Sequence, residues 1–296
     1  MATKTKVMSS ESILSRKAVL IKLNVNYEIG YSMIDKKATE EIDLSHKATK
    51  AGKFVKHLFQ SDDLIEIRDA VRIAEKAHRR YTLKWLDSGI RILPVSVFDR
   101  HETEIKRANE AFQKAVNNFI ENYDEIVERN KLRLGDLADD CYYSKKRVRD
   151  GLRLWVGYFP MPTEDDFRID GNVAMVKSVK SQFSESLKEY EYRAKSEVAE
   201  RLGIAVKRLF DRLNDADKKV KDGMLSKLVV LLGDLKDLNV TEDQNISDLI
   251  TSVETSFAKE SADFMSENAD YRSKKKKEAE AIITKLTECF PRAIEF

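Results

Sequence analysis

The chain has 296 residues, enough to bury a sizeable core in one large domain or in two. Charged residues make up 35% of it and hydrophobic residues 42%, with ten glycines and four prolines, a composition that favours long amphipathic helices. Because 53 basic side chains are nearly balanced by 51 acidic ones, the net charge of +2 excludes a strong overall attraction to polyanions, and any affinity for nucleic acid or membranes requires local patches.

The first part of the chain predicts one strand and one helix. Apolar and polar residues alternate over residues 19–27, the period-two pattern of a half-buried strand. The polar stretch 32–56 has no clear periodicity, so a loop or a weak helix is expected there. Residues 61–88 have helical spacing, and the IRILPVSVF segment after them should be extended because the residue before Pro94 disfavours helical geometry.

The middle of the chain predicts two more helices. Apolar residues step by three or four from 99 to 130, which indicates one continuous helix. A short helix is expected over residues 144–155.

The last part of the chain predicts the longest helices. Residues 176–213 keep helical spacing for longer than an ordinary globular helix, with Gly203 as a candidate interruption, so an antiparallel hairpin or coiled coil is expected. The segment MLSKLVVLLGDLKDLNV is the most apolar and should lie deepest, and residues 242–286 form a last helical region with Asn268 as a candidate break.

The segment LWVGYFPMPTEDDFRID, residues 154–170, combines aromatic residues, two prolines and four acids. The prolines hold the chain extended, which favours a structural corner filled by the aromatic side chains. Exposed aromatic residues would instead form a docking surface for a protein partner. The candidate partner-binding residues are Trp155, Tyr158, Phe159 and Phe167. A third reading is a metal site or acid pair, which would use Glu164, Asp165 and Asp166.

Known catalytic and cofactor-binding patterns do not fit this sequence. Laid on a calcium loop, residues 166–177 place Lys177 where a bidentate glutamate belongs. The ATKAGKF segment lacks the upstream glycine and the hydroxyl residue of a nucleotide-binding loop. The four histidines have no metal-ligand spacing, and Cys141 and Cys289 have no metal or redox spacing. We therefore expect a non-enzymatic protein without a cofactor, with reduced thiols and a cytoplasmic location.

Basic residues cluster in three places that could contact nucleic acid: two clusters that supply the candidate residues below, and a predicted helix lined by Arg68, Arg72, Lys76, Arg79 and Arg80. Phosphate binding requires such cations, and neighbouring aromatic side chains can stack on unpaired bases. The alternative is a solvated helix face, because acids are interspersed. The candidate residues are Lys145, Lys146, Arg147 and Arg149 in the first cluster and Arg272, Lys274, Lys275, Lys276 and Lys277 in the second.

Several segments, in their order along the chain, resemble those of a known family. They are LIKLNVNY; IRDAVRIAEKAHRRYTLKWLDSGIRILP, which runs into FQKAVNNFIENYDEIV; YFPMPTEDDFRI; LFDRLNDADKKVKDGMLSKLVVLLGDLKDLNV; and YRSKKKKEAEAII. Together they resemble, over nearly the full chain, a phage and bacterial family described only as a domain of unknown function, whose members often lie beside CobS-like AAA+ ATPases. The resemblance implies a AAA+ ATPase as a partner, and the host cytoplasm as the location if the chain is phage-encoded. It implies no active-site residue.

Together these patterns predict a mainly α protein with long antiparallel helices and a small strand-containing N-terminal portion. We expect an N-terminal segment over residues 1–60, a helical region with the corner over 61–170, and a long-helix region over 171–296 that packs with the second as one unit. The favoured function is a phage-type interaction or scaffold protein that self-associates or engages a AAA+ ATPase. A DNA- or RNA-binding protein of phage replication or recombination is the alternative, and a carboxylate-metal enzyme is the third.

Overall fold

The computed structural model describes residues 13–27, 31–85, 89–138, 142–163, 173–215 and 217–292. It confirms a mainly α protein with long helices and a small strand-containing N-terminal portion. The chain forms two compact units, each assembled from separate stretches. Unit 1 comprises Met1–Lys22, Arg79–Arg100 and Tyr158–Phe296, and unit 2 comprises Leu23–His78 and His101–Gly157.

A small antiparallel sheet begins in the expected N-terminal strand. After the short helix α1 (Ile13–Lys17), β1 runs over Ala18–Asn26, close to the predicted 19–27. In unit 1 it pairs with β5 (Arg91–Pro94), from Ala18 opposite Pro94 to Ile21 opposite Arg91, and β5 pairs in turn with β4 (Leu83–Lys84). The strand order is β4-β5-β1-β6, with β6 at Arg153–Phe159.

The extended geometry predicted for IRILPVSVF holds only as far as Pro94. Pro94 itself is extended, and the next residues form a 3₁₀ turn, Val95–Val97, that leads into α4 (Phe98–Glu121). The expectation was wrong beyond Pro94 because a proline restricts the residue before it and is well tolerated where a helix begins.

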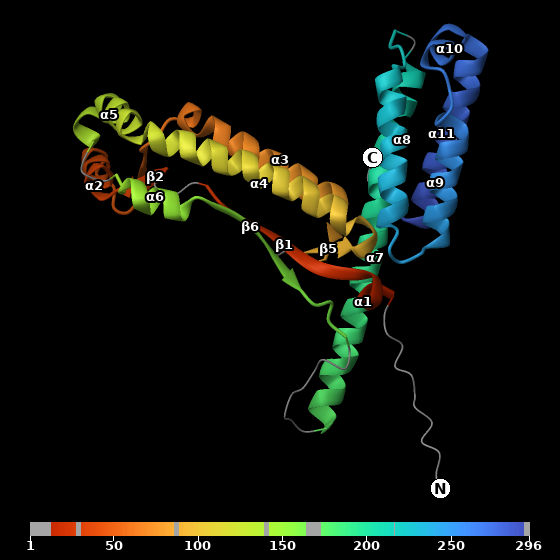
Figure 1. Ribbon diagram of the computed structural model, residues 1–296, viewed down its shortest axis with the longest axis horizontal. Coiled ribbons are helices and arrows are strands. Elements are labelled where there is room, and N and C mark those ends of the chain that lie inside the picture. Colours follow the sequence, from red (N-terminus) through yellow and green to blue (C-terminus); the bar gives the residue numbers. More distant parts are fainter. Residues whose placement is uncertain are drawn as a thin grey trace. The chain divides into compact units, whose positions relative to one another are not determined.

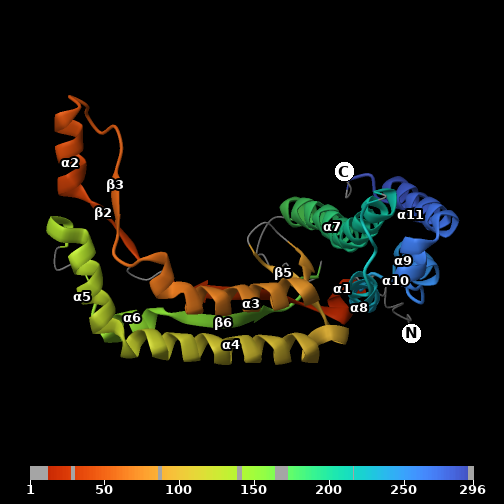
Figure 2. The same ribbon diagram turned by 90° about the horizontal axis from the view of Figure 1, so that it is seen from above.

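The helices of unit 1 lie side by side (Figure 1 and Figure 2). They are α7 (Val173–Asn214), α8 (Asp222–Leu238), α9 (Gln244–Phe257), the short α10 (Ala262–Glu267) and α11 (Ala269–Cys289). The long helix predicted over 176–213 is confirmed as α7, and Gly203 lies buried inside it without interrupting it. The predicted break at Asn268 is confirmed, because this residue caps α11.

The apolar helix α8 is less deeply placed than its sequence predicts. Its buried leucines, among them Leu225, Leu228 and Leu232, follow a single stripe with a spacing of three or four residues. Val229 and Val230 on the other side are 44% and 53% exposed. One face of α8 is therefore open although residues 228–232 are all apolar.

Unit 2 is built on two long helices that lie side by side, α3 (Ile65–Tyr81) and α4 (Figure 1 and Figure 2). Between them lies a continuous core in which the rings of Phe59, Phe119 and Tyr123 pack mainly edge to face, with centroids 5.6 to 5.9 Å apart. The remaining elements are β2 (Ser32–Asp35), α2 (Lys36–Ser45), β3 (Phe54–His57), α5 (Tyr123–Leu134) and α6 (Lys145–Gly151), with 3₁₀ turns at Ser61–Leu64 and Gly135–Leu137.

Three sequence expectations in unit 2 were wrong in whole or in part. Residues 32–56 were expected to form a loop or a weak helix: a helix is present there as α2, but the β2–β3 hairpin on either side of it was missed. The helix expected over 99–130 is divided at Asn122 into α4 and α5. The carbonyl oxygen of Asn118 accepts there from both the backbone NH and the side-chain amide of Asn122. The helix expected over 144–155 ends at Gly151, and the aromatic residues after it extend as β6.

No helix within the described part of the chain is both long and apolar enough to cross a membrane.

Candidate functional site

The two halves of α7 differ in burial. All the buried side chains of this helix lie at or after Ala194, so none of the side chains in residues 173–193 is buried. The apolar stripe nevertheless continues through this first half, where Val176, Val179 and Leu187 are half-buried. Near its start Val173 is 84% exposed and Met175 is 55% exposed. The described fold covers this stripe only in part, for example at Tyr190, whose ring lies 4.5 Å from that of the buried Trp85.

A second surface lies on α6 and the start of β6, in unit 2. The guanidinium of Arg147 stacks on the ring of Tyr143, with its central carbon 3.9 Å from the ring centroid. Lys146 and Arg149 are exposed, and neither has an ion-pair partner among the described residues. Trp155, which points outward from β6, is 50% exposed. These five residues are called the α6–β6 patch below.

The remaining candidate residues of the first basic cluster and of the segment 154–170 are not part of the α6–β6 patch. Lys145 forms an ion pair with Asp124 at 2.7 Å. In unit 1, Tyr158 and Phe159 are 48% and 44% exposed, and the ring of Tyr158 lies 5.9 Å from that of Phe98. Phe167 and the acids Glu164, Asp165 and Asp166 lie outside the described residues.

Arg272, from the second basic cluster, binds backbone of its own chain. Its guanidinium donates to four carbonyl oxygens, of which Leu213 and Arg212 belong to the last turn of α7 and Asp215 and Lys218 follow it. The last carbonyls of a helix have no partners within the helix. Arg272 supplies hydrogen bonds there, so its role in the fold is to close the end of α7.

Lys275 is also held inside unit 1. It is only 5% exposed, and its ammonium lies 3.0 Å from a carboxylate oxygen of Glu260 and of Glu278 and 2.8 Å from the carbonyl oxygen of Ser256. Burial alone would lower the pKa of Lys275, but its hydrogen bonds with the two glutamates hold the pKa above its ordinary value. The second cluster therefore presents Lys274 and Lys277 outward, while Lys276 is half-buried with its ammonium 5.9 Å from the ring centroid of Phe210 on α7.

A buried carboxylate joins α7 to the strands of unit 1. Glu197 lies 2.8 Å from Arg91 of β5 and 2.7 Å from Arg201 of α7, and its second oxygen accepts from the backbone NH of Lys84. Arg201 and Arg91 also donate to the carbonyl oxygen of Thr82, at 2.6 and 3.0 Å. Burial alone would raise the pKa of Glu197, but the two guanidinium groups hold it below its ordinary value. Both carboxylate oxygens of Glu197 accept hydrogen bonds within this cluster.

A pair of buried histidines lies in unit 2. Nδ1 of His78 is 3.1 Å from Nε2 of His101, and the two residues are 5% and 0% exposed. Burial lowers the pKa of His101 to about 4. His101 is therefore neutral at physiological pH. Within the described chain no cluster of three or more His, Cys, Asp or Glu side chains is placed to hold a metal ion.

The structure also brings together a set of cations that the sequence analysis missed. Arg208 and Arg212 of α7 and Lys221 and Lys227 beside or within α8 line one groove between the two helices. In the sequence these cations are scattered among acids, and only the packing of α7 against α8 makes them neighbours. No pattern confined to one segment could have found them.

Comparisons with known proteins give no guide to the role of these surfaces: no family model, no curated protein and no solved structure matches the chain.

Proposed function

We propose that this chain is a non-enzymatic interaction or scaffold protein that self-associates through the first half of α7. One observation carries the proposal: within an unbroken helix, residues 173–193 continue the apolar stripe of the core but have no buried side chain. In coiled coils such a stripe, repeated every three or four residues, is the seam that a second helix covers.

The energetics of an isolated helix support a partner at this position. Residues 173–193 would extend for about 30 Å as a helix. Most helical stability in proteins comes from packing of an apolar face, and helices without such packing are marginal in water. The segment also contains four serines and three valines, which are not strong helix formers. A second helix packed on Val176, Val179 and Leu187 would stabilise it.

Charge favours a second copy of the same helix in antiparallel orientation. Residues 173–184 contain two lysines and no acid, whereas residues 185–191 contain three glutamates and one lysine. Antiparallel pairing places the positive end of one helix against the negative end of the other, and parallel pairing would place like charges together. The resulting contact would have two-fold symmetry, the commonest arrangement in homodimers.

Sedimentation equilibrium tests this proposal. The unmodified chain should reach the mass of a dimer as its concentration rises, and the Val179→Glu, Leu187→Glu double variant should remain a monomer because it places charges on the seam. Lys285→Glu, on the exposed face of α11, is the control and should dimerise like the unmodified chain. A monomeric unmodified chain, or a double variant that dimerises with equal affinity, would contradict the proposal.

Disulfide cross-linking tests the orientation, in a background with both native cysteines replaced by serine. Antiparallel pairing over residues 173–193 places Lys177 of one chain opposite Glu189 of the other. It therefore predicts a cross-linked dimer between a Lys177→Cys chain and a Glu189→Cys chain, and little cross-linking of either variant with itself. Parallel pairing would give the reverse pattern.

Engagement of a AAA+ ATPase belongs to the same proposal, and its support is the resemblance of the sequence segments alone. It is tested by co-purification of the tagged chain from its native host. ATPase enrichment no greater than that with a tag-only control would count against it.

Nucleic-acid binding is the second candidate function, and the α6–β6 patch is the observation that favours it. Its three cations lie on α6, and Trp155, on the strand that follows α6, is half exposed and could stack on an unpaired base. The binding of a fluorescent oligothymidine should weaken steeply with salt, and also in Lys146→Glu, Arg149→Glu and in Trp155→Ala. The control Lys285→Glu should bind like the unmodified chain. If the affinity changes neither with salt nor in these variants, the patch is not the nucleic-acid-binding site.

A further inference from the structure

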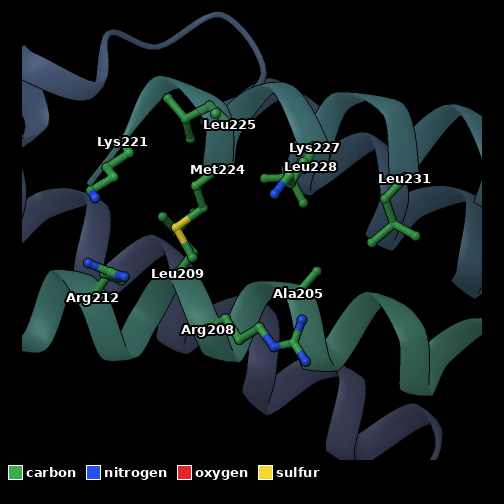
Figure 3. A pocket seen from close by; sticks show the side chains of 11 residues that line it. Ala205, Arg208, Leu209, Arg212, Lys221, Met224, Leu225, Lys227, Leu228 and Leu231 are labelled. Atoms are coloured by element: carbon green, nitrogen blue, oxygen red, sulfur yellow. The ribbon is translucent and has the colours of Figure 1, made fainter. Parts of the chain in front are cut away.

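The groove between α7 and α8 has an apolar floor and positively charged sides (Figure 3). Its volume is about 500 Å³. The floor is aliphatic, made by Ala205, Leu209, Met224, Leu228 and Leu231. Two of these floor residues, Leu209 and Leu228, are buried, at 1% and 5% exposure, so the floor is continuous with the core of unit 1.

Four cations line this groove without any carboxylate among the lining residues. They are Arg208, Arg212, Lys221 and Lys227. Arg212 makes only a long hydrogen bond, 3.4 Å, to the carbonyl oxygen of Lys219, and in the described chain none of the other three has an ion-pair partner. The nearby acid Asp211 pairs elsewhere, with Lys207 at 3.2 Å. The groove thus has uncompensated positive charge, and an occupant that carries negative charge is favoured.

The positions of the cations distinguish between kinds of anionic occupant. Arg212 and Lys221 lie together near one end of the groove, while Arg208 and Lys227 lie further along it (Figure 3). The lined stretch spans about 10 Å of α7 and about 15 Å of α8, or two to three helical turns. An amphiphile with one anionic head group would satisfy one end only. An occupant with charges distributed along both sides of an apolar strip would satisfy both.

The aliphatic floor of the groove does not suit single-stranded nucleic acid as an occupant. Single-stranded nucleic acid binds to grooves in which aromatic side chains stack on the bases. No aromatic side chain is among the lining residues of this groove. Aliphatic side chains between two helices instead match the leucine-type stripe of a third helix, the usual arrangement in helix-in-groove recognition.

We propose that the α7–α8 groove binds an acidic amphipathic helix of a partner protein. The apolar stripe of that helix would lie on Ala205, Met224 and Leu231, and its flanking Asp or Glu residues would pair with Arg208 and Arg212 on one side and Lys221 and Lys227 on the other. This site uses residues 205–212 of α7 and is separate from the self-association seam at 173–193. Its test is therefore independent of that proposal.

Fluorescence anisotropy with the full chain tests the groove. The probe is a labelled synthetic helix with leucines at i, i+3, i+4 and i+7 and glutamates on both flanks, and the control peptide has glutamine in place of every glutamate. The glutamate peptide should bind at least tenfold more tightly than the glutamine peptide, and its affinity should fall as salt is raised.

Variants locate the binding site. Arg208→Glu with Lys227→Glu should weaken binding of the glutamate peptide at least tenfold, and Ala205→Trp should do the same by filling the floor without changing charge. Lys285→Glu changes a cation on another helix and should leave the affinity within about twofold. All variants should retain the circular dichroism and melting temperature of the unmodified chain, which separates loss of the groove from loss of folding.

Three outcomes would overturn the proposal. The first is that the glutamate peptide does not bind, or that it binds both groove variants with the same affinity as the unmodified chain. The second is an oleate or oligothymidine ligand that binds in the groove while the peptide does not. The third is loss of self-association in Arg208→Glu, Lys227→Glu, since the occupant would then be a second copy of this chain. Peptide binding that persists in Val179→Glu, Leu187→Glu would confirm that the groove acts apart from the seam.

Discussion

Individual basic residues of this chain have roles that their neighbours in the sequence do not share. Lys274, Lys275, Lys276 and Lys277 form one uninterrupted run, yet only Lys275 in it is buried. A helix turns by about 100° per residue, so at most one or two of four consecutive side chains can face the same neighbour. The sequence shows the run but does not show which lysine faces inward, because that depends on where α9 and α10 pack.

The first prediction concerns Lys275. Lys275→Met should lower the free energy of unfolding by about 1–3 kcal/mol, because Glu260 and Glu278 would keep their charges and lose the shared cation. The lower part of this range reflects the partial exposure of the two glutamates, 24% and 28%. Urea unfolding at neutral pH measures the difference. Lys277→Met, which removes an exposed cation of the same run, should stay within about 0.5 kcal/mol of the unmodified chain, and equal losses in both variants would exclude the buried role.

The second prediction concerns the buried histidine pair. The pKa of His101 is about 4 in the folded chain, below its ordinary value of 6.5, so the unfolded chain binds more protons between these two values. The resulting stability is complete above pH 6.5 and declines as the pH falls toward 4. Between about pH 7.5 and pH 5 the loss from this one group should be about 2 kcal/mol.

His101→Gln provides the control for this pH dependence. The variant lacks the titrating group, so its unfolding free energy should fall less than that of the unmodified chain over the same pH range, whatever its stability at neutral pH. Parallel pH profiles for the two proteins would show that His101 is not the source. Urea midpoints measured at several pH values supply both profiles.

At the scale of elements, prediction from the sequence was best where one apolar stripe is long. The spacing over residues 176–213 predicted α7 nearly to its ends, and the break predicted near Asn268 is present, where the asparagine side chain caps α11. The β2–β3 hairpin was missed because Ser32, Met33 and Ile34 are all exposed in β2, so its strands carry no buried alternating face that a pattern could report. The exposure of Val230 on α8 likewise depends on how many helices surround it.

The third prediction concerns the start of α11. The side chain of Asn268 accepts a hydrogen bond from the backbone NH of Tyr271 at 2.9 Å, which satisfies one of the unpaired donors of the first turn. Asn268→Ala should therefore lower the free energy of unfolding by about 1 kcal/mol, and Asn268→Asp should largely retain it, because aspartate caps equally well. Thermal unfolding of the three proteins distinguishes them, and an alanine variant as stable as the aspartate variant would show that the cap does not contribute.

At the scale of the whole molecule, each unit is assembled from stretches that are separated in the sequence. Residues 79–100 of unit 1 lie in the chain between the two stretches of unit 2. The boundaries fall within continuous elements, such as α3 and α4, and not at linkers rich in glycine, proline or serine. Composition therefore gave no signal of this division. The grouping of cations in the α7–α8 groove could not be predicted from the sequence for the same reason. The division into units and this grouping both depend on how the helices pack.

The last prediction follows from this assembly and concerns Glu197. In the full chain this buried carboxylate pairs with Arg91, which comes from a distant stretch, and with Arg201, four residues away on α7. Glu197→Gln in the full chain should lower the free energy of unfolding by about 2–4 kcal/mol, because both guanidinium groups would lose their counter-charge in a buried position. A fragment over residues 173–296 keeps the α7–α11 core but lacks Arg91, Thr82 and Lys84. There Glu197 would be exposed to solvent and paired only with Arg201.

In that fragment Glu197→Gln should change stability by less than about 0.5 kcal/mol, since an exposed pair four residues apart on a helix contributes little. Urea unfolding of the four proteins, followed by circular dichroism, gives both differences. An equal loss in the fragment would mean that Glu197 is buried by α7–α11 alone. A small loss in the full chain would mean that the contacts with Arg91 and the strands do not stabilise unit 1. The contrast between the two backgrounds therefore measures how much the α7–α11 helices depend on residues 79–100.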